Sequence, residues 1–127
     1  IFTQFMIKPM IKNKRGNIVN ISSNSAIDGN EGRSSYVSTK AALISQARVL
    51  SRELGPNNIR VNTIAPGLTN TDMMSKNTTK EVIDEIVSRT PLGKIAEPKN
   101  IANVALFLSS ALSDHITGQV IRVDGGI

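Results

Sequence analysis

The stretch Asn17-Ile18-Val19-Asn20-Ile21-Ser22-Ser23 decides the fold. Its apolar run is typical of a buried β-strand, and a long helical pattern follows it after a loop that contains glycine. Strands that are joined by helical crossovers form a parallel α/β sheet with right-handed connections. Ligands bind such sheets at the carboxyl ends of the strands, so the hydroxyl of Ser23 is expected at a ligand-binding edge.

Outward from this stretch, the sequence predicts alternating helices and strands. The expected helices cover residues 2–13, 34–54, 78–89 and 98–110, and the expected strands cover residues 18–22, 59–65 and 119–123. Pro9 is expected to kink the first helix, and Gly16 to end it. Ser34 or Ser35 is expected to cap the second helix, which stops at Gly55-Pro56. Thr78 and Glu81 form a possible capping box for the third helix.

The segment Tyr36-Val37-Ser38-Thr39-Lys40 begins the long helical pattern. Residues four apart lie on the same helix face, so the side chains of Tyr36 and Lys40 can interact. An ammonium close to a tyrosine favours its phenolate form, which a general acid or base at neutral pH needs. Ser23, thirteen residues before Tyr36, would hydrogen-bond the reacting oxygen. These three side chains predict proton transfer to or from a carbonyl or alcohol oxygen, without a metal.

Four ordered motifs along the chain resemble the short-chain dehydrogenase/reductase family. They are Asn20-Ile21-Ser22-Ser23, Tyr36-Val37-Ser38-Thr39-Lys40, Arg60-Val61-Asn62-Thr63-Ile64-Ala65-Pro66-Gly67 and Val123-Asp124-Gly125-Gly126. The resemblance spans essentially the whole chain and is strongest to 3-oxoacyl-[acyl-carrier-protein] reductases and related bacterial alcohol or sugar dehydrogenases. It implies a Rossmann-type doubly wound sheet and an NAD(P)-dependent oxidoreductase that interconverts a carbonyl and a secondary alcohol.

The resemblance also implies a role for each catalytic residue. Tyr36 would donate a proton to the substrate oxygen during reduction, and Ser23 would hold that oxygen. Lys40 would favour the phenolate and also bind the cofactor ribose, so that Tyr36 and Lys40 both border the cofactor. The segments 28–33 and 71–79 would border the substrate.

The loop after the second strand would carry the other cofactor contacts. It contains Pro66, Gly67, Thr69 and Thr71. Backbone groups around Thr69 would meet the nicotinamide carboxamide, Thr71 would approach ribose or phosphate, and Gly67 permits a close backbone approach. Relatives usually have a branched apolar residue in place of Thr69, so its backbone role carries over more safely than a side-chain role.

Several family features are absent from the 127 residues. There is no Gly-x-x-x-Gly-x-Gly cluster and no Asn-Asn-Ala-Gly segment. Residues 1–127 are therefore interpreted as the C-terminal portion of a single Rossmann-type domain whose N-terminal dinucleotide-binding half is absent, and this portion alone is expected to be inactive. The choice between NAD and NADP stays open, because the ribose-reading residues belong to that half. A catalytically silent protein of the same fold, used for binding or assembly, is the alternative.

Composition limits the other function classes. No apolar stretch approaches the length that spans a membrane, and the absence of cysteine excludes disulfides, which suits a cytoplasmic enzyme. Of the net charge of +5, four units come from Lys8, Lys12, Lys14 and Arg15, which precede the first acidic residue, and the rest of the chain has a net charge of only +1. With few aromatic residues, this cluster does not predict nucleic-acid binding.

Two expectations about partners follow. Lys12, Lys14 and Arg15 are a hypothetical docking site for an acidic carrier protein that would deliver the substrate. The lone His115 lacks partners for a metal site.

Relatives form dimers or tetramers through the long helix and the helix before it, and use the C-terminal helix and strand as a second interface. The small residues of the long helix, from Ser38 to Ala47, either allow such an approach or pack within the subunit.

Overall fold

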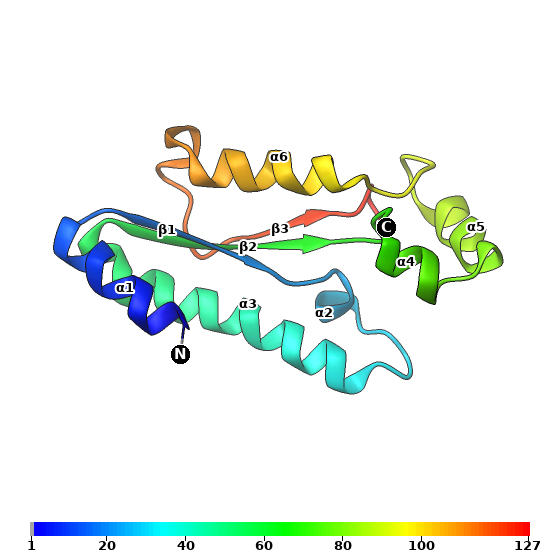
Figure 1. Cartoon of the computed structure of the whole chain (residues 1–127), viewed down its shortest axis with the longest axis horizontal. Helices are drawn as coiled ribbons and strands as arrows, with labels where there is room; N and C mark the ends of the chain where they lie inside the picture. The colour runs from blue at the N-terminus through cyan, green and yellow to red at the C-terminus, as the bar shows by residue number, and fades with distance from the viewer. Residues whose placement is uncertain (1) are drawn as a thin grey trace.

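The computed structural model describes residues 2–127 and contains a parallel three-stranded sheet in the order β1-β2-β3 (Figure 1). The elements follow in the order α1 (Phe2–Asn13), β1 (Gly16–Ile21), α2 (Ser25–Asp28), α3 (Ser34–Leu54), η1 (Gly55–Asn57), β2 (Ile59–Pro66), α4 (Asp72–Asn77), α5 (Lys80–Arg89), α6 (Pro98–Ser109), η2 (Ala111–Ser113) and β3 (Val120–Val123). Helices α1 and α3 cover one face of the sheet and α6 covers the other. The predicted α/β class with three parallel strands is confirmed.

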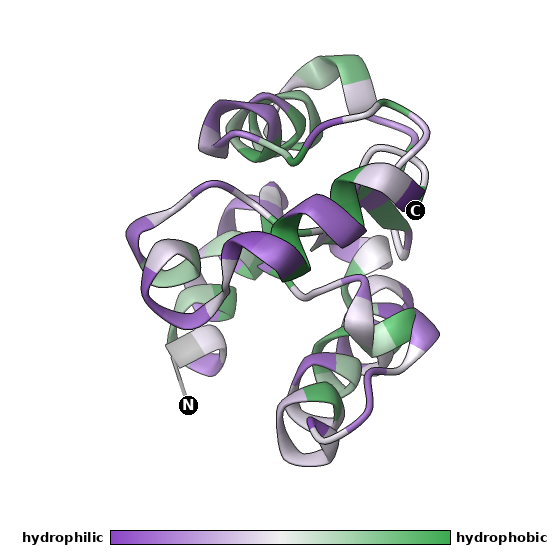
Figure 2. Ribbon diagram, turned by 90° about the vertical axis from the view of Figure 1, so that its right-hand side faces the viewer, coloured by the Kyte–Doolittle hydropathy of each residue, from purple (hydrophilic) through white to green (hydrophobic). Residues whose placement is uncertain are grey.

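The core lies around the central strand β2, whose residues from Val61 to Ala65 are all buried. On the α3 face, Ile59 and Val61 pack against Ala47 and Leu54. On the other face, Leu108 of α6 is fully buried. The helices carry both hydrophobic and hydrophilic residues, which suits their position between the sheet and solvent (Figure 2).

The prediction that the first strand is buried is wrong. Every described residue of β1 is only partly buried or exposed, and the side chain of Ile21 is 43% exposed. Strand β1 pairs with β2 from Gly16 to Ile21 but has no partner on its other side within residues 2–127. The apolar run of β1 is therefore typical of a central strand, although β1 lies at an edge of the described sheet.

Three helix ends differ from the predictions. Helix α1 ends where Lys14 adopts a left-handed φ of 46°, while Gly16 already belongs to β1. A Cβ atom on Gly16 would lie 2.7 Å from the sulfur of Met10, so close packing explains this glycine.

The other two differences concern helix caps. Helix α3 begins at Ser34 after Arg33, with no side-chain cap. Helix α5 begins one residue later than predicted, after Thr79 instead of Thr78. The short helices α2 and α4, of four and six residues, were not predicted.

Polar side chains of β2 fix the segment that leads into β3. Buried Asn62 donates to the carbonyl of Ile116 (2.8 Å) and accepts from the N–H of Gln119 (3.0 Å). Arg60 donates to the carbonyls of Leu108 (2.9 Å) and Ser110 (3.1 Å) at the end of α6. These two residues of the Arg60–Gly67 motif thus serve the fold and hold β3 in register.

Candidate active site

The predicted site residues follow the carboxyl ends of β1 and β2. Because the two strands are parallel and paired up to Ile21 and Ile64, their ends lie at the same edge of the sheet. The N–H of Asn24 donates to the carbonyl of Pro66 (2.9 Å) and joins the two connecting segments. The structure therefore brings Ser23 and the Pro66–Thr71 loop to one edge, as predicted.

Lys40 and Tyr36 lie in the first two turns of α3. The Lys40 ammonium nitrogen is 5.9 Å from the centre of the Tyr36 ring, so the two side chains share a helix face. The same nitrogen donates to the carbonyl of Ile21 at the end of β1 (3.0 Å). That hydrogen bond fixes the ammonium two residues before Ser23 and leaves it two further protons to donate.

Ser22 and Ser23 are both buried but make different contacts. The hydroxyl of Ser22 donates to the carbonyl of Lys40 (2.8 Å) and so ties the end of β1 to α3. The hydroxyl oxygen of Ser23 instead accepts from the N–H of Ser25 (3.2 Å), which leaves the Ser23 proton available for another acceptor. This arrangement suits a structural role for Ser22 and a substrate-facing role for Ser23.

The loop after β2 presents backbone groups around Thr69. The two residues that flank Thr69 hydrogen-bond the backbone of Ala96. The N–H of Ala96 donates to the carbonyl of Leu68 (3.0 Å), and the N–H of Asn70 donates to the carbonyl of Ala96 (2.8 Å). Successive backbone groups of an extended segment point to opposite sides, so the N–H and C=O of Thr69 face away from Ala96. These two groups can hydrogen-bond a planar amide such as a carboxamide.

Gly67 and Thr71 have contacts that the sequence did not reveal. A Cβ atom on Gly67 would lie 2.7 Å from the Cβ of Asp124 and 2.9 Å from its Cα, so the close approach that this glycine permits is to the C-terminal segment. The hydroxyl of Thr71 accepts from the N–H of Met74 (3.3 Å) and caps α4. Its proton stays free to bind an oxygen atom.

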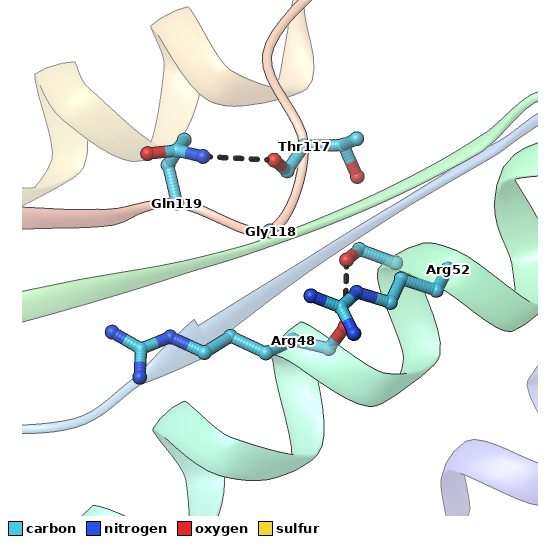
Figure 3. Close-up of a pocket in the computed structure, with 6 residues that line it drawn as sticks. Arg48, Arg52, Thr117, Gly118 and Gln119 are labelled. Carbon is cyan, nitrogen blue, oxygen red and sulfur yellow. Dashed lines mark hydrogen bonds between the residues drawn. The ribbon is translucent and has the colours of Figure 1, made fainter.

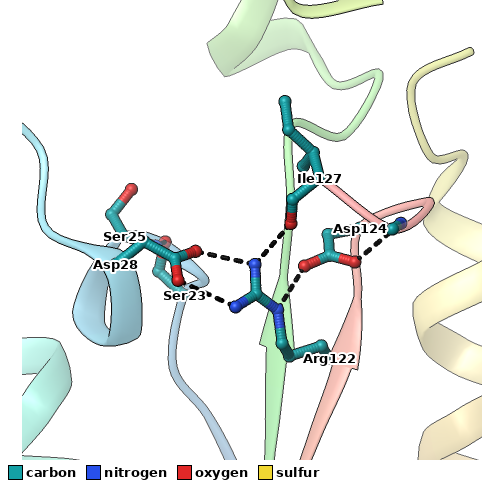
Figure 4. Close-up of polar contacts among 7 residues, drawn as sticks. Ser23, Ser25, Asp28, Arg122, Asp124 and Ile127 are labelled. Carbon is teal, nitrogen blue, oxygen red and sulfur yellow. Dashed lines mark hydrogen bonds and ion pairs between the residues drawn. The ribbon is translucent and has the colours of Figure 1, made fainter. Parts of the chain in front are cut away.

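An ionic network that sequence reasoning missed lies beside Ser23. Arg122 of β3 donates to both carboxylate oxygens of Asp28 (2.8 and 2.7 Å) and through Nε to Asp124 (2.6 Å) (Figure 4). These hydrogen bonds, first with Asp28 and then with Asp124, raise the pKa of Arg122 above its already high ordinary value. No local signal could have revealed the pair, because 94 positions separate Asp28 from Arg122.

A cavity of about 400 Å³ lies elsewhere, between α3 and the segment before β3 (Figure 3). It is lined by Arg48, Ser51, Arg52, Thr117, Gly118 and Gln119, none of which belongs to the predicted site. Within residues 2–127, no cluster of three or more His, Cys, Asp or Glu side chains could hold a metal ion. No helix of the described part of the chain is long and apolar enough to cross a membrane.

Comparison with known proteins agrees with the fold and the four motifs. The family model described as enoyl-(acyl carrier protein) reductase matches residues 2–127. The model covers nearly the whole chain, and the similar solved structures include proteins described as short-chain dehydrogenase/reductases. The chain therefore belongs to the short-chain dehydrogenase/reductase family.

Individual relatives show which members of the family the chain is similar to. The chain is 47% identical over 122 residues to 3-oxoacyl-[acyl-carrier-protein] reductase of Chlamydia muridarum, which covers 96% of this chain and 49% of the relative. It superimposes on the 3-oxoacyl-[acyl-carrier protein] reductase of Brucella melitensis with a TM-score of 0.89 and 38% identity, over 95% of this chain and 45% of that one. The chain spans about half the length of the curated relatives it matches.

A third relative was solved as a complex. This protein is a 7α-hydroxysteroid dehydrogenase in complex with NADH and 7-oxo-glycochenodeoxycholic acid. Its TM-score is 0.89 at 40% identity, over 92% of this chain and 46% of that chain. The fold of the described residues is thus shared with proteins named as 3-oxoacyl-[acyl-carrier-protein] reductases and as a hydroxysteroid dehydrogenase.

Proposed function

We propose that residues 1–127 are the C-terminal portion of a single Rossmann-type domain, and that the complete protein reduces a 3-oxoacyl thioester to the 3-hydroxyacyl thioester with NADPH or NADH. The observation that carries this proposal is the placement of Lys40. Its ammonium group is fixed to the end of β1 and lies over the ring of Tyr36, where a proton-transferring phenol needs it. The identity to 3-oxoacyl-[acyl-carrier-protein] reductases supports the choice of substrate.

In this mechanism, Tyr36 gives its hydroxyl proton to the carbonyl oxygen of the substrate. Ser23 donates its free proton to the same oxygen and stabilises the negative charge that develops there. Lys40 stabilises the phenolate left on Tyr36, since an ammonium close by favours the charged form. In the reverse direction, Tyr36 takes the proton from the alcohol.

The described residues fit a nicotinamide cofactor on one side. The backbone N–H and C=O of Thr69 would bind the carboxamide, the free protons of Lys40 would bind the ribose, and the hydroxyl of Thr71 would bind ribose or phosphate. Pro66 and Gly67 would lie along the nicotinamide, although Gly67 is required here by its contact with Asp124. The bound cofactor supplies hydride to the carbonyl carbon.

Delivery of the substrate by an acidic carrier protein is a second part of the proposal. The exposed basic cluster Lys12, Lys14 and Arg15 lies before the amino end of β1, whereas Ser23 follows its carboxyl end (Figure 1). A strand of six residues spans about 20 Å. The cluster therefore fits long-range electrostatic steering of a carrier better than direct contact with the reacting group.

Turnover assays of the complete protein test this function. The assays would use NADPH and NADH with a 3-oxobutanoyl thioester, an enoyl thioester, a 7-oxo bile acid and a small ketose. We expect the 3-oxoacyl thioester to give the highest kcat/KM. The hydroxysteroid dehydrogenase relative favours the bile acid as the second candidate. A folded protein that neither binds the cofactor nor turns over any of the four would favour the catalytically silent alternative.

A further inference from the structure

The short helix α2 lies between the candidate catalytic serine and the ionic network of Arg122. Helix α2 has only four residues and none of them is buried, so packing contributes little to holding it. A single helical turn is also unstable by itself. Polar contacts at its two ends, together with its contacts to α3, therefore hold it in place.

At its first end, α2 is joined to the site. The N–H of Ser25 donates to the hydroxyl oxygen of Ser23 (3.2 Å), and the N–H of Asn24 donates to the carbonyl of Pro66 (2.9 Å). The orientation of the Ser23 hydroxyl thus depends on where α2 begins. A shift of α2 would turn the hydroxyl away from a substrate oxygen.

At its other end, α2 is held by Arg122. Asp28, the last residue of α2, receives two hydrogen bonds from the guanidinium group, the bidentate geometry that gives arginine–carboxylate pairs their strength. In the register, Arg122 pairs with Ala65 of the central strand, whose small side chain leaves room for the arginine to reach across to Asp28. Figure 4 shows the guanidinium group between Asp28 and Asp124.

The same guanidinium group also fixes the C-terminal segment. It donates to Asp124 and to the backbone oxygen of Ile127, and the other carboxylate oxygen of Asp124 accepts from the N–H of Gly126 (3.0 Å). The side chain of Asp124 is only 6% exposed, so this end of the network is rigid. Arg122 therefore connects the short helix beside Ser23 to the C-terminal segment that contacts Gly67.

We propose that Arg122 is a positioning residue, which holds α2 through Asp28 and thereby orients the hydroxyl of Ser23. Its kinetic consequence rests on the proposed oxidoreductase function. Within residues 2–127, the hydrogen bonds of the Arg122 side chain go to Asp28, Asp124 and Ile127 and to none of the candidate catalytic or cofactor residues.

Kinetics of the complete protein give the first test, with the best substrate of the assay panel. Arg122→Gln and Asp28→Asn are each expected to lower kcat by about 10- to 100-fold, since small misplacements of a catalytic group have effects of that size. The double variant should lose no more than the single variants, because both remove the same contact. The dissociation constant of the cofactor should stay within about twofold of wild type.

Arg89→Gln is the matched control. Arg89 forms an exposed pair with Glu85 on α5, at 3.6 Å, away from the site. This variant should keep the wild-type kcat. Arg122→Lys should fall between wild type and Arg122→Gln, because an ammonium retains the charge but lacks the fork that binds both carboxylate oxygens.

Amide hydrogen exchange gives a second test that needs no turnover. The N–H groups of Asp28 and Gly29 bond to the carbonyls of Asn24 and Ser25 within α2 (3.1 and 3.0 Å). In Arg122→Gln these amides should exchange at least about fivefold faster, while those of α6 should not change. If the wild type were inactive, this measurement would still decide whether Arg122 holds α2.

Three results would overturn the proposal. The first is unchanged exchange of the α2 amides in Arg122→Gln. The second is faster exchange with a wild-type kcat in an active protein, which would limit Arg122 to a structural role. The third is multiplicative losses in the double variant, which would show that Arg122 and Asp28 act independently.

Discussion

Ser22 and Ser23 are adjacent and equally buried, yet their hydrogen bonds give them different tasks. Ser22 donates its proton to the backbone of α3, while Ser23 keeps its proton for another acceptor. The sequence predicted Ser23 as the functional serine from its thirteen-residue distance to Tyr36. It offered no role for Ser22, because the partner carbonyl lies on an element that meets β1 only in the folded chain.

Replacing each serine by alanine in the complete protein should separate these tasks. Ser23→Ala should lower kcat by about 100-fold or more, because it removes a donor to the developing oxyanion, and should lower the free energy of unfolding less than Ser22→Ala does, since the hydrogen bond that it removes is longer (3.2 Å against 2.8 Å). Ser22→Ala should lower the free energy of unfolding by about 1 kcal/mol through loss of one hydrogen bond. Kinetics and denaturant titration measure both effects, and a larger loss of kcat in Ser22→Ala would reverse the assignment.

Among the elements, the long helices and all three strands were predictable, and the shortest helices were not. The helical pattern of residues 34–54 and the apolar strand of residues 59–65 are long enough for their periodicity to identify them, and the structure places α3 and β2 there. Helices α2 and α4 contain one or two turns, too few for a period to show. The exposure of β1 also escaped prediction, because burial of a strand depends on neighbours that its own sequence does not specify.

Helix α5 provides a pH-dependent test at the scale of an element. The N–H of Glu81 itself, and then the hydroxyl of Thr79, hydrogen-bond the Glu81 carboxylate and lower its pKa. A carboxyl group whose pKa is lower in the folded state stabilises that state above its unfolded pKa, and the stabilisation is lost as the pH falls through the folded value. Glu81→Gln should therefore destabilise the protein slightly at pH 7, and the difference should vanish in acid.

A carboxyl titration followed by NMR checks the cause. The Glu81 pKa should lie below the ordinary glutamate value in the wild type. Removing the hydroxyl in Thr79→Val should raise it part of the way back, since the Glu81 N–H remains. An unshifted Glu81 pKa in the wild type would contradict the two hydrogen bonds to its carboxylate.

For the whole molecule, the exposed apolar surface indicates where further chains would bind. The side chains of Leu106 and Leu112 are 70% and 82% exposed, and with Phe107 they border a cavity of about 490 Å³ on α6. Of the small residues of α3 considered for an interface, Ala47 is buried in the subunit core, whereas Ser38, Ala42 and Ser45 are exposed. The α6 surface therefore fits the second interface that the family resemblance implies.

Sedimentation of the complete protein tests this interface. We expect a dimer or tetramer, and Leu106→Glu with Leu112→Glu should reduce its mass because charges on a buried apolar surface disfavour association. The control Leu92→Glu changes another exposed leucine, 68% exposed and outside this surface. A wild type that sediments as a monomer at all concentrations would remove the expectation.

Turnover by Tyr36→Phe in the complete protein is the most direct test of the proposed chemistry. The variant lacks only the hydroxyl that transfers the proton, while the ring under the Lys40 ammonium remains. We predict a loss of at least about 100-fold in kcat, with cofactor affinity nearly unchanged. A Tyr36→Phe protein that turns over the 3-oxoacyl thioester at the wild-type rate would contradict the assignment of Ser23, Tyr36 and Lys40 as the catalytic residues.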